Sequence, residues 1–158
     1  MVALVGMILV VTRVRSDESG VGHLSFASTH TAGAPFGDFA EARVAVGSKC
    51  LRVLVASAPG QRSQGLREVR SLKPYAGMLF VNPRDTNARY TMAETPMPLD
   101  ITFFSARGLP VDDARMTPCP HGSDATCPEY ESKAPYRFAL ERPTGSASGS
   151  GSLGPCAA

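Results

Sequence analysis

The chain has 158 residues, and 16 lysines and arginines against 14 aspartates and glutamates give it a formal net charge of +2. This near balance excludes a polybasic nucleic-acid-binding surface and an acidic tail as organising features. Hydrophobic residues make up 43% of the chain, which indicates a globular domain. The 15 glycines and 13 prolines favour short strands and turns over long helices.

An apolar run from Met1 to Val11 opens the chain. Its length suits the core of a secretory signal, although no positive segment precedes it and no clear cleavage site follows. It is too short to span a bilayer as a helix. We interpret residues 1–15 as a signal or anchor segment whose true start could lie upstream, and residues 16–40 as a flexible linker. The alternative is that the apolar run is the first strand of the domain.

A hairpin and a short helix are predicted at the start of the globular part. Two β-rich runs at 42–46 and 50–56 flank a three-residue loop. A helix of one to two turns is expected over 57–66, with Ser57 as its N-cap and Gly65 as its end.

Short strands with turns between them fill the rest of the domain, which we place at residues 41–145. They are expected at residues 77–81, 89–92, 99–104, 109–111 and 136–141. This spacing predicts an α+β, mainly β fold: a compact small barrel or sandwich of short strands with one or two short helices. Residues 146–158 are interpreted as a low-complexity Gly/Ser tail.

The cysteines bear on the compartment. Turn-forming residues separate Cys119 from Cys127, so the chain can bring the two sulfurs together, and a disulfide of this loop length contributes about 2–3 kcal/mol. Zinc binding by Cys119, His121 and Cys127 is the alternative, but no second ligand cluster completes a structural zinc site. Cys50 is expected to be a buried free thiol, and a pair with Cys156 stays open.

Six ordered motifs carry a family resemblance. They are Arg62-x-x-Gly65-Leu66, Gly77 to Val81, Thr91-Met92, Thr95-x-x-Pro98-Leu99-Asp100-Ile101, Met116-x-Pro118-Cys119 and Ala139-Leu140-Glu141. In these motifs the chain resembles the domain of unknown function 192 family, as an actinobacterial-type exported member. The resemblance implies a small, mainly β domain with no established biochemical activity.

The chain also departs from the pattern of that family. The family often has Trp-Met-Lys-Asn-Thr where this chain has Thr91-Met92-Ala93-Glu94-Thr95, so a cation and an amide are replaced. Arg67 stands where the family often has methionine, and the segment that forms the family's last strand is almost without apolar residues here. If the segment from Thr91 to Thr95 binds a ligand, the charge of that binding site is altered in this chain. The last strand is expected to be missing or frayed.

The best polar constellation consists of Arg62, Glu94, Thr95 and Asp100. Asp100 lies at the entry to an apolar strand, where a carboxylate is costly unless it is paired. Arg62 is its natural partner, because a guanidinium binds a carboxylate at two points. This pair is predicted to form the floor of a ligand pocket with Glu94 and Thr95 on the rim. The alternative is an ion pair that only fixes the loop between Thr95 and Asp100.

These features predict an exported or membrane-tethered module that binds a small ligand or an envelope component. Contact with the membrane is expected only through the N-terminal segment, and no nucleic acid, cofactor or metal is expected. A hydrolase acting on an envelope polymer through Glu94 and Asp100 is one alternative. An intracellular interaction protein is another. No nucleophile motif or phosphate-binding loop occurs, which favours a non-enzymatic role.

Overall fold

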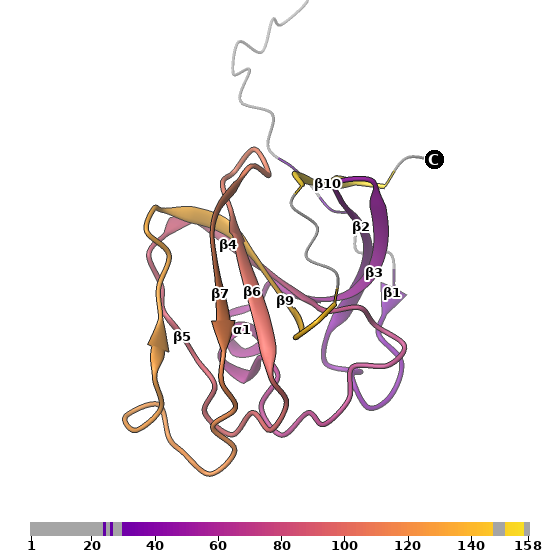
Figure 1. The fold of residues 1–158 in the computed structure, drawn as a ribbon. Helices are drawn as coiled ribbons and strands as arrows, with labels where there is room; N and C mark the ends of the chain where they lie inside the picture. The colour runs from indigo at the N-terminus through magenta and orange to yellow at the C-terminus, as the bar shows by residue number, and fades with distance from the viewer. Residues whose placement is uncertain (1–23, 25, 27–29, 147–150, 157–158) are drawn as a thin grey trace, which may run out of the picture.

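The computed structural model describes residues 24, 26, 30–146 and 151–156 (Figure 1). Strands account for most of the regular structure in this part of the chain. In order, the elements are β1 (His30–Thr31), β2 (Ala40–Val46), β3 (Lys49–Ala56), α1 (Pro59–Gln64), β4 (Met78–Thr86), β5 (Tyr90–Thr91), β6 (Leu99–Phe104), β7 (Pro110–Met116), β8 (Glu129–Tyr130), β9 (Tyr136–Pro143) and β10 (Leu153–Pro155).

One mixed sheet forms the body of the domain, with the strand order β1-β2-β3-β4-β9-β6-β7 and with β10 paired to β2. The β3–β4 pair is parallel and the other pairs are antiparallel. Strands β5 and β8 form a separate two-stranded sheet. The main sheet is open, since β1 and β7 end its strand order, and the architecture is sandwich-like rather than a closed barrel. The prediction of an α+β, mainly β fold is therefore confirmed.

Both faces of the sheet are buried, and each carries its own hydrophobic core. Successive side chains of a strand point to opposite faces. On β3, Leu54 accordingly belongs to one core, whereas Val53 and Val55 belong to the other. The first core also includes Leu66, Leu72 and Tyr75, which follow α1 in the chain. Burial on both faces explains the almost continuous apolar runs in the central strands.

The start of the domain lies further upstream than the sequence indicates. β1 pairs with β2, and three apolar residues of the segment expected to be linker are buried: Ala32, Phe36 and Phe39. The ring of Phe36 packs edge-on against Tyr75 at 5.7 Å between centroids. Their spacing shows no period because they belong to turns, so the linker interpretation fails from residue 30 onward. Met1 to Val11 lies outside the described residues.

The C-terminal segment also joins the sheet as β10, so the interpretation of residues 146–158 as a tail and the expectation of a missing or frayed last strand are wrong at Leu153–Pro155. Leu153 of β10 pairs with Val46 of β2 and is 2% exposed. Cys156 forms a disulfide with Cys50, with 5.5 Å between their Cα atoms. The expectation of a buried free thiol at Cys50 is therefore wrong: the residue is exposed at the start of β3 and bonded to the C-terminal segment.

Two local details differ from the predicted ones. The β2–β3 connection is a two-residue turn of Gly47 and Ser48, and Gly47 has a φ of 58°, which favours glycine. At the start of α1, the side-chain oxygen of Gln61 accepts the backbone N–H groups of Ser57 and Ala58, at 3.0 and 2.9 Å. A glutamine side chain thus replaces the expected serine cap.

Within the described residues, no helix has the length and hydropathy that a bilayer crossing requires.

Candidate functional site

A cavity of about 500 Å³ lies between α1, the β5–β8 pair and the main sheet. Its apolar wall includes Phe80 of β4, Met92 after β5 and Leu99 of β6, each no more than 2% exposed. Polar side chains surround this wall, and their charges come from both acids and bases. The charged residues that line the cavity are Arg62, Arg67, Arg89, Asp124, Glu129 and Glu141.

Glu141 is the deepest of these charged residues. It lies on β9 between Met78 of β4 and Ile101 of β6, both fully buried, and is itself only 4% exposed. Within the described part of the chain, its carboxyl has no side-chain hydrogen bond or ion pair. No fully enclosed side-chain oxygen or nitrogen there lacks a partner, so the Glu141 oxygens open onto the cavity. Burial raises the pKa of Glu141 from 4.5 to about 8, and the carboxyl is therefore mostly protonated at neutral pH.

The alternation of β9 explains this position. Phe138 and Leu140 belong to the core on the far face, so Ala139 and Glu141 face the cavity side. The backbone beside Glu141 is also tightly packed, because a Cβ atom at Gly77 would lie 2.4 Å from the Glu141 carbonyl oxygen. The position of the Glu141 backbone therefore depends on a glycine in the neighbouring segment.

Arg62 enters the cavity from α1, as predicted for a ligand-binding residue. Its Nη1 donates hydrogen bonds to the carbonyl oxygens of Ser57 and Val81. Among the described residues, no carboxylate forms an ion pair with it. The guanidinium is thus held by backbone groups and keeps an unneutralised charge at the cavity.

Asp100 does not meet Arg62, and the predicted ion pair is wrong. Because Leu99 and Ile101 of β6 face the cavity side, Asp100 faces the other side of the sheet. There it accepts hydrogen bonds from Arg115 at 3.3 Å and Thr144 at 3.2 Å, and it lines a separate groove along β6 and β7. Hydrogen bonds from Arg115 and Thr144 therefore satisfy the Asp100 carboxylate, for which the sequence predicted Arg62 as the partner.

Glu94 and Thr95 lie in the turn after β5. The Thr95 side chain is 4% exposed, lines the cavity and donates its hydroxyl to the Ala93 carbonyl at 3.2 Å. Glu94 is exposed, and its carboxylate accepts a hydrogen bond from Arg67 at 3.0 Å. The structure therefore brings Arg62 and Thr95 to one cavity and leaves Glu94 at the edge, tied to another cavity residue.

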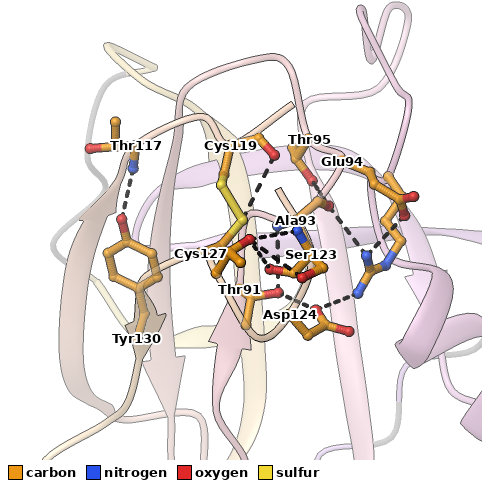
Figure 2. The surroundings of a disulfide bond; sticks show 12 residues. Thr91, Ala93, Glu94, Thr95, Thr117, Cys119, Ser123, Asp124, Cys127 and Tyr130 are labelled. Atoms are coloured by element: carbon orange, nitrogen blue, oxygen red, sulfur yellow. Dashed lines mark hydrogen bonds and ion pairs between the residues drawn. A yellow bond between two sulfur atoms is a disulfide. The ribbon is translucent and has the colours of Figure 1, made fainter. Parts of the chain in front are cut away.

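A disulfide loop builds one side of this edge. Cys119 and Cys127 are bonded, with 6.1 Å between their Cα atoms, which confirms the predicted pair. Figure 2 shows the disulfide beside the turn that carries Glu94 and Thr95, where it closes the loop that carries Asp124. Asp124 accepts hydrogen bonds from Arg67 and from the Thr91 hydroxyl, both at 2.7 Å. The loop is thus fastened to residues that line the cavity.

The bonded sulfurs leave no thiolate for the zinc alternative. Among the described residues, no group of three or more histidines, cysteines, aspartates and glutamates is arranged to hold a metal ion. Two disulfides, Cys50–Cys156 and Cys119–Cys127, are typical of a protein from an oxidising compartment.

Comparison with known families identifies the domain. Residues 42–152 match the model of DUF192, described as "Uncharacterized ACR". The chain belongs to the DUF192 family. The match extends past residue 145 and takes in the turn after β9 and the glycine-rich approach to β10.

Two crystal structures share the fold of this DUF192 domain. A candidate transcription regulator from Sinorhizobium meliloti 1021 is 27% identical, with a TM-score of 0.63 over 73% of this chain and 93% of that one. A protein of unknown function from Novosphingobium aromaticivorans DSM 12444 is 21% identical, with a TM-score of 0.62 over 75% of this chain and 84% of that one. No curated protein matches the sequence significantly.

Sequence reasoning passed over Glu141 as a site residue. The alternation of the strand pointed the other way, because Phe138 and Leu140 mark its apolar phase and Glu141 falls in the phase of Arg137 and Ala139. A glutamate at this position suits a strand end exposed to solvent. Only the pairing of β9 with both β4 and β6 shows that the position is interior.

Proposed function

We propose that this DUF192 domain is a binding module that holds a small polar molecule in the cavity beside Glu141. The observation that carries the proposal is the Glu141 carboxyl itself, 4% exposed, open to the cavity and without a side-chain partner in the described residues. Buried polar side chains are almost always hydrogen-bonded. Because the Glu141 oxygens open onto the cavity, a ligand there can supply the side-chain partner that the described residues do not.

The shape of the cavity supports the same function. Ligand sites are concave and largely apolar, with a few polar groups that fix orientation, and they typically enclose about 300–1,000 Å³. This cavity of about 500 Å³ combines an apolar wall of Phe80, Met92 and Leu99 with Glu141 and Arg62. Such a site suits a metabolite-sized molecule better than a polymer.

We further propose that the module works outside the cytoplasm, at the cell envelope. The two disulfides support this, because cytosolic thiols are kept reduced. Attachment to a membrane through residues 1–15 stays a proposal. An intracellular interaction protein has less support for the same reason.

A hydrolase that uses Glu94 and Asp100 has little geometric support. An acid–base pair must face the same substrate across one cleft. Asp100 lines the groove along β6 and β7, whereas Glu94 is ion-paired with Arg67 at the other cavity. Binding without catalysis is therefore the function that we propose.

The test is a thermal-shift screen of polar metabolites with three proteins: the full chain, Glu141→Gln and Asp100→Asn. Both variants change a carboxyl to an amide, and only the first lies in the cavity. At a hundred times its dissociation constant, a ligand should stabilise the wild-type chain by about 2.7 kcal/mol. We expect Glu141→Gln to lose most of this shift and Asp100→Asn to keep it. Failure of every compound, or equal shifts in all three proteins, would contradict the proposal.

A further inference from the structure

The three arginines that line the cavity differ in whether a carboxylate forms an ion pair with them. Two of the three are neutralised by carboxylates. Arg67 pairs with Asp124 at 2.7 Å and with Glu94 at 3.0 Å. Arg89 pairs with Glu129 at 2.7 Å and with Glu131 at 3.2 Å.

Arg62 is the arginine of this cavity without a carboxylate partner in the described residues. A guanidinium carries five N–H donors, and the hydrogen bonds of Arg62 to Ser57 and Val81 use only Nη1. The fixed charge and the remaining donors suit an anionic group, which a guanidinium can bind at two points. Arg62 is therefore one anchoring point for a ligand.

Glu141 is a second anchoring point and is separate from the first. Burial is the cause of its raised pKa, and Arg62 does not act on it appreciably. Both groups act on Tyr90, however: Glu141 raises the pKa of the Tyr90 phenol and Arg62 lowers it. The carboxyl and the guanidinium thus lie within electrostatic range of one residue without forming an ion pair with each other.

Aromatic rings in the same cavity favour a cationic group on the ligand. Tyr90 and Phe80 both line the cavity and pack edge-on with their centroids 5.1 Å apart. Ring faces attract ammonium groups, and a carboxylate beside them adds a charged acceptor.

We infer that the ligand is a small zwitterion, which places its carboxylate on Arg62 and its amino group on Glu141. This inference rests on the proposed function, because it names the class of molecule that the same cavity holds. A molecule with both groups serves both anchoring points, whereas an anion or a cation alone serves one.

Binding should then release a proton. Free Glu141 is mostly a neutral acid, and the ammonium group of the ligand requires a carboxylate, so the Glu141 proton passes to solvent as the ion pair forms. The neighbouring strand positions, Met78 and Ile101, do not titrate. The titratable and charged groups that share the cavity are Arg62 of α1, Arg67 after it, Arg89 and Tyr90 at β5, Asp124 of the disulfide loop and Glu129 of β8.

The experiment uses isothermal titration of the full chain with ω-amino carboxylates, from glycine to 6-aminohexanoate. Hexanoate and hexylammonium are the matched probes with one charged group. We expect one chain length to bind at least tenfold tighter than either single-charge probe. Titration at about pH 7 in two buffers of different ionisation enthalpy should show release of roughly 0.9 proton per ligand, as a pKa of about 8 requires.

Variants assign the two ends. Arg62→Gln should weaken the bifunctional probe at least tenfold and leave hexylammonium unchanged. Glu141→Gln should weaken it as much, leave hexanoate unchanged and abolish the proton release. Arg84→Gln is the control and should leave the affinity for every probe unchanged, because Arg84 is exposed on β4 and does not line the cavity.

Equal affinity for single-charge and bifunctional probes, proton uptake, or no binding of any probe would overturn the zwitterion inference. The proposed function is judged separately by the metabolite screen. A hit there that depends on Glu141 but carries a single charge would contradict the inference and leave the binding function standing.

Discussion

Glu141 links the cavity to the stability of the whole domain. Its pKa is raised from 4.5 to about 8 by burial, so folding holds a proton on a group that the unfolded chain releases. Below about pH 4.5 both states are protonated and the burial carries no pH-dependent penalty. As the pH rises toward 8, the unfolded state loses the proton first, and stability falls by roughly 1.4 kcal/mol per pH unit.

Glu141→Gln should remove this dependence, since glutamine has nearly the same size and does not ionise. We expect the variant to be more stable than the wild-type chain by a few kcal/mol at about pH 8 and to differ little at about pH 4. Urea melts over this range measure the difference, with Asp100→Asn as the control. Parallel pH profiles for the wild-type chain and Glu141→Gln would show that the carboxyl is hydrated and ordinary.

The strained backbone conformation of Glu68 leads to a second prediction for a single residue. Glu68 has a φ of 61°, is exposed, and donates its backbone N–H to the Glu94 carbonyl at 2.7 Å. Asparagine tolerates this left-handed conformation better than glutamate. Glu68→Asn should therefore stabilise the fold by about 0.5–1 kcal/mol in denaturant melts. Arg70→Asn, an exposed position nearby, is the control and should be neutral or slightly destabilising.

Residue types gave a partial view of the site. Arg62 was predicted at a pocket as the partner of Asp100, with Thr95 on the rim. Arg62 and Thr95 do line one cavity, but Asp100 pairs with Arg115 elsewhere, so the reasoning that led to Arg62 was wrong. Asp100 could not be assigned to a face without the register of β6, because one residue decides which side of a sheet a side chain faces. The burial of Glu141 could not be predicted, because it depends on the strands beside β9, which are distant in the sequence.

Short elements without regular periodicity complete the core. The alternation in β6 and β9 predicted these strands within two residues at each end. The turn after β1 carries no such pattern, although Phe36 and Phe39 are 5% and 8% exposed. β10 has three residues and one buried side chain, too few for any periodic signal.

Removal of the segment before Ala40 should destabilise the fold. A buried phenylalanine contributes about 1.5–3 kcal/mol, and this truncation removes two together with the β1–β2 pairing. A chain that begins at Ala40 should melt on the order of 10 °C lower than one that begins at Leu24. A chain that begins at His30 is the control and keeps β1. Equal melting of all three would mean that the Phe36 contact with Tyr75 adds nothing.

At the scale of the whole molecule, the Cys50–Cys156 disulfide ties the C-terminal segment to the sheet. It joins residues 106 positions apart, whereas Cys119 and Cys127 are eight apart. The entropy that a cross-link removes from the unfolded chain grows with loop length, to about 4–5 kcal/mol for the long loop and about 2–3 for the short one.

The double variant Cys50→Ser with Cys156→Ser should therefore lose more stability than Cys119→Ser with Cys127→Ser. The second pair should have the larger effect on ligand binding, because its loop holds Asp124 against Arg67 and Thr91. Denaturant melts and ligand titration of both variants separate the two effects. The reverse order in either measurement would contradict this division between the two disulfides.

The central claim is that a protonated carboxyl on the middle of the sheet opens into a ligand cavity. Carboxyl ¹³C NMR of the full chain, with the Glu141 resonance assigned by comparison with Glu141→Gln, measures this group directly. The account predicts an apparent pKa of about 8 for Glu141 in the free protein. A pKa near the ordinary 4.5 would contradict it, since the carboxyl would then be hydrated and would offer a ligand no unsatisfied group.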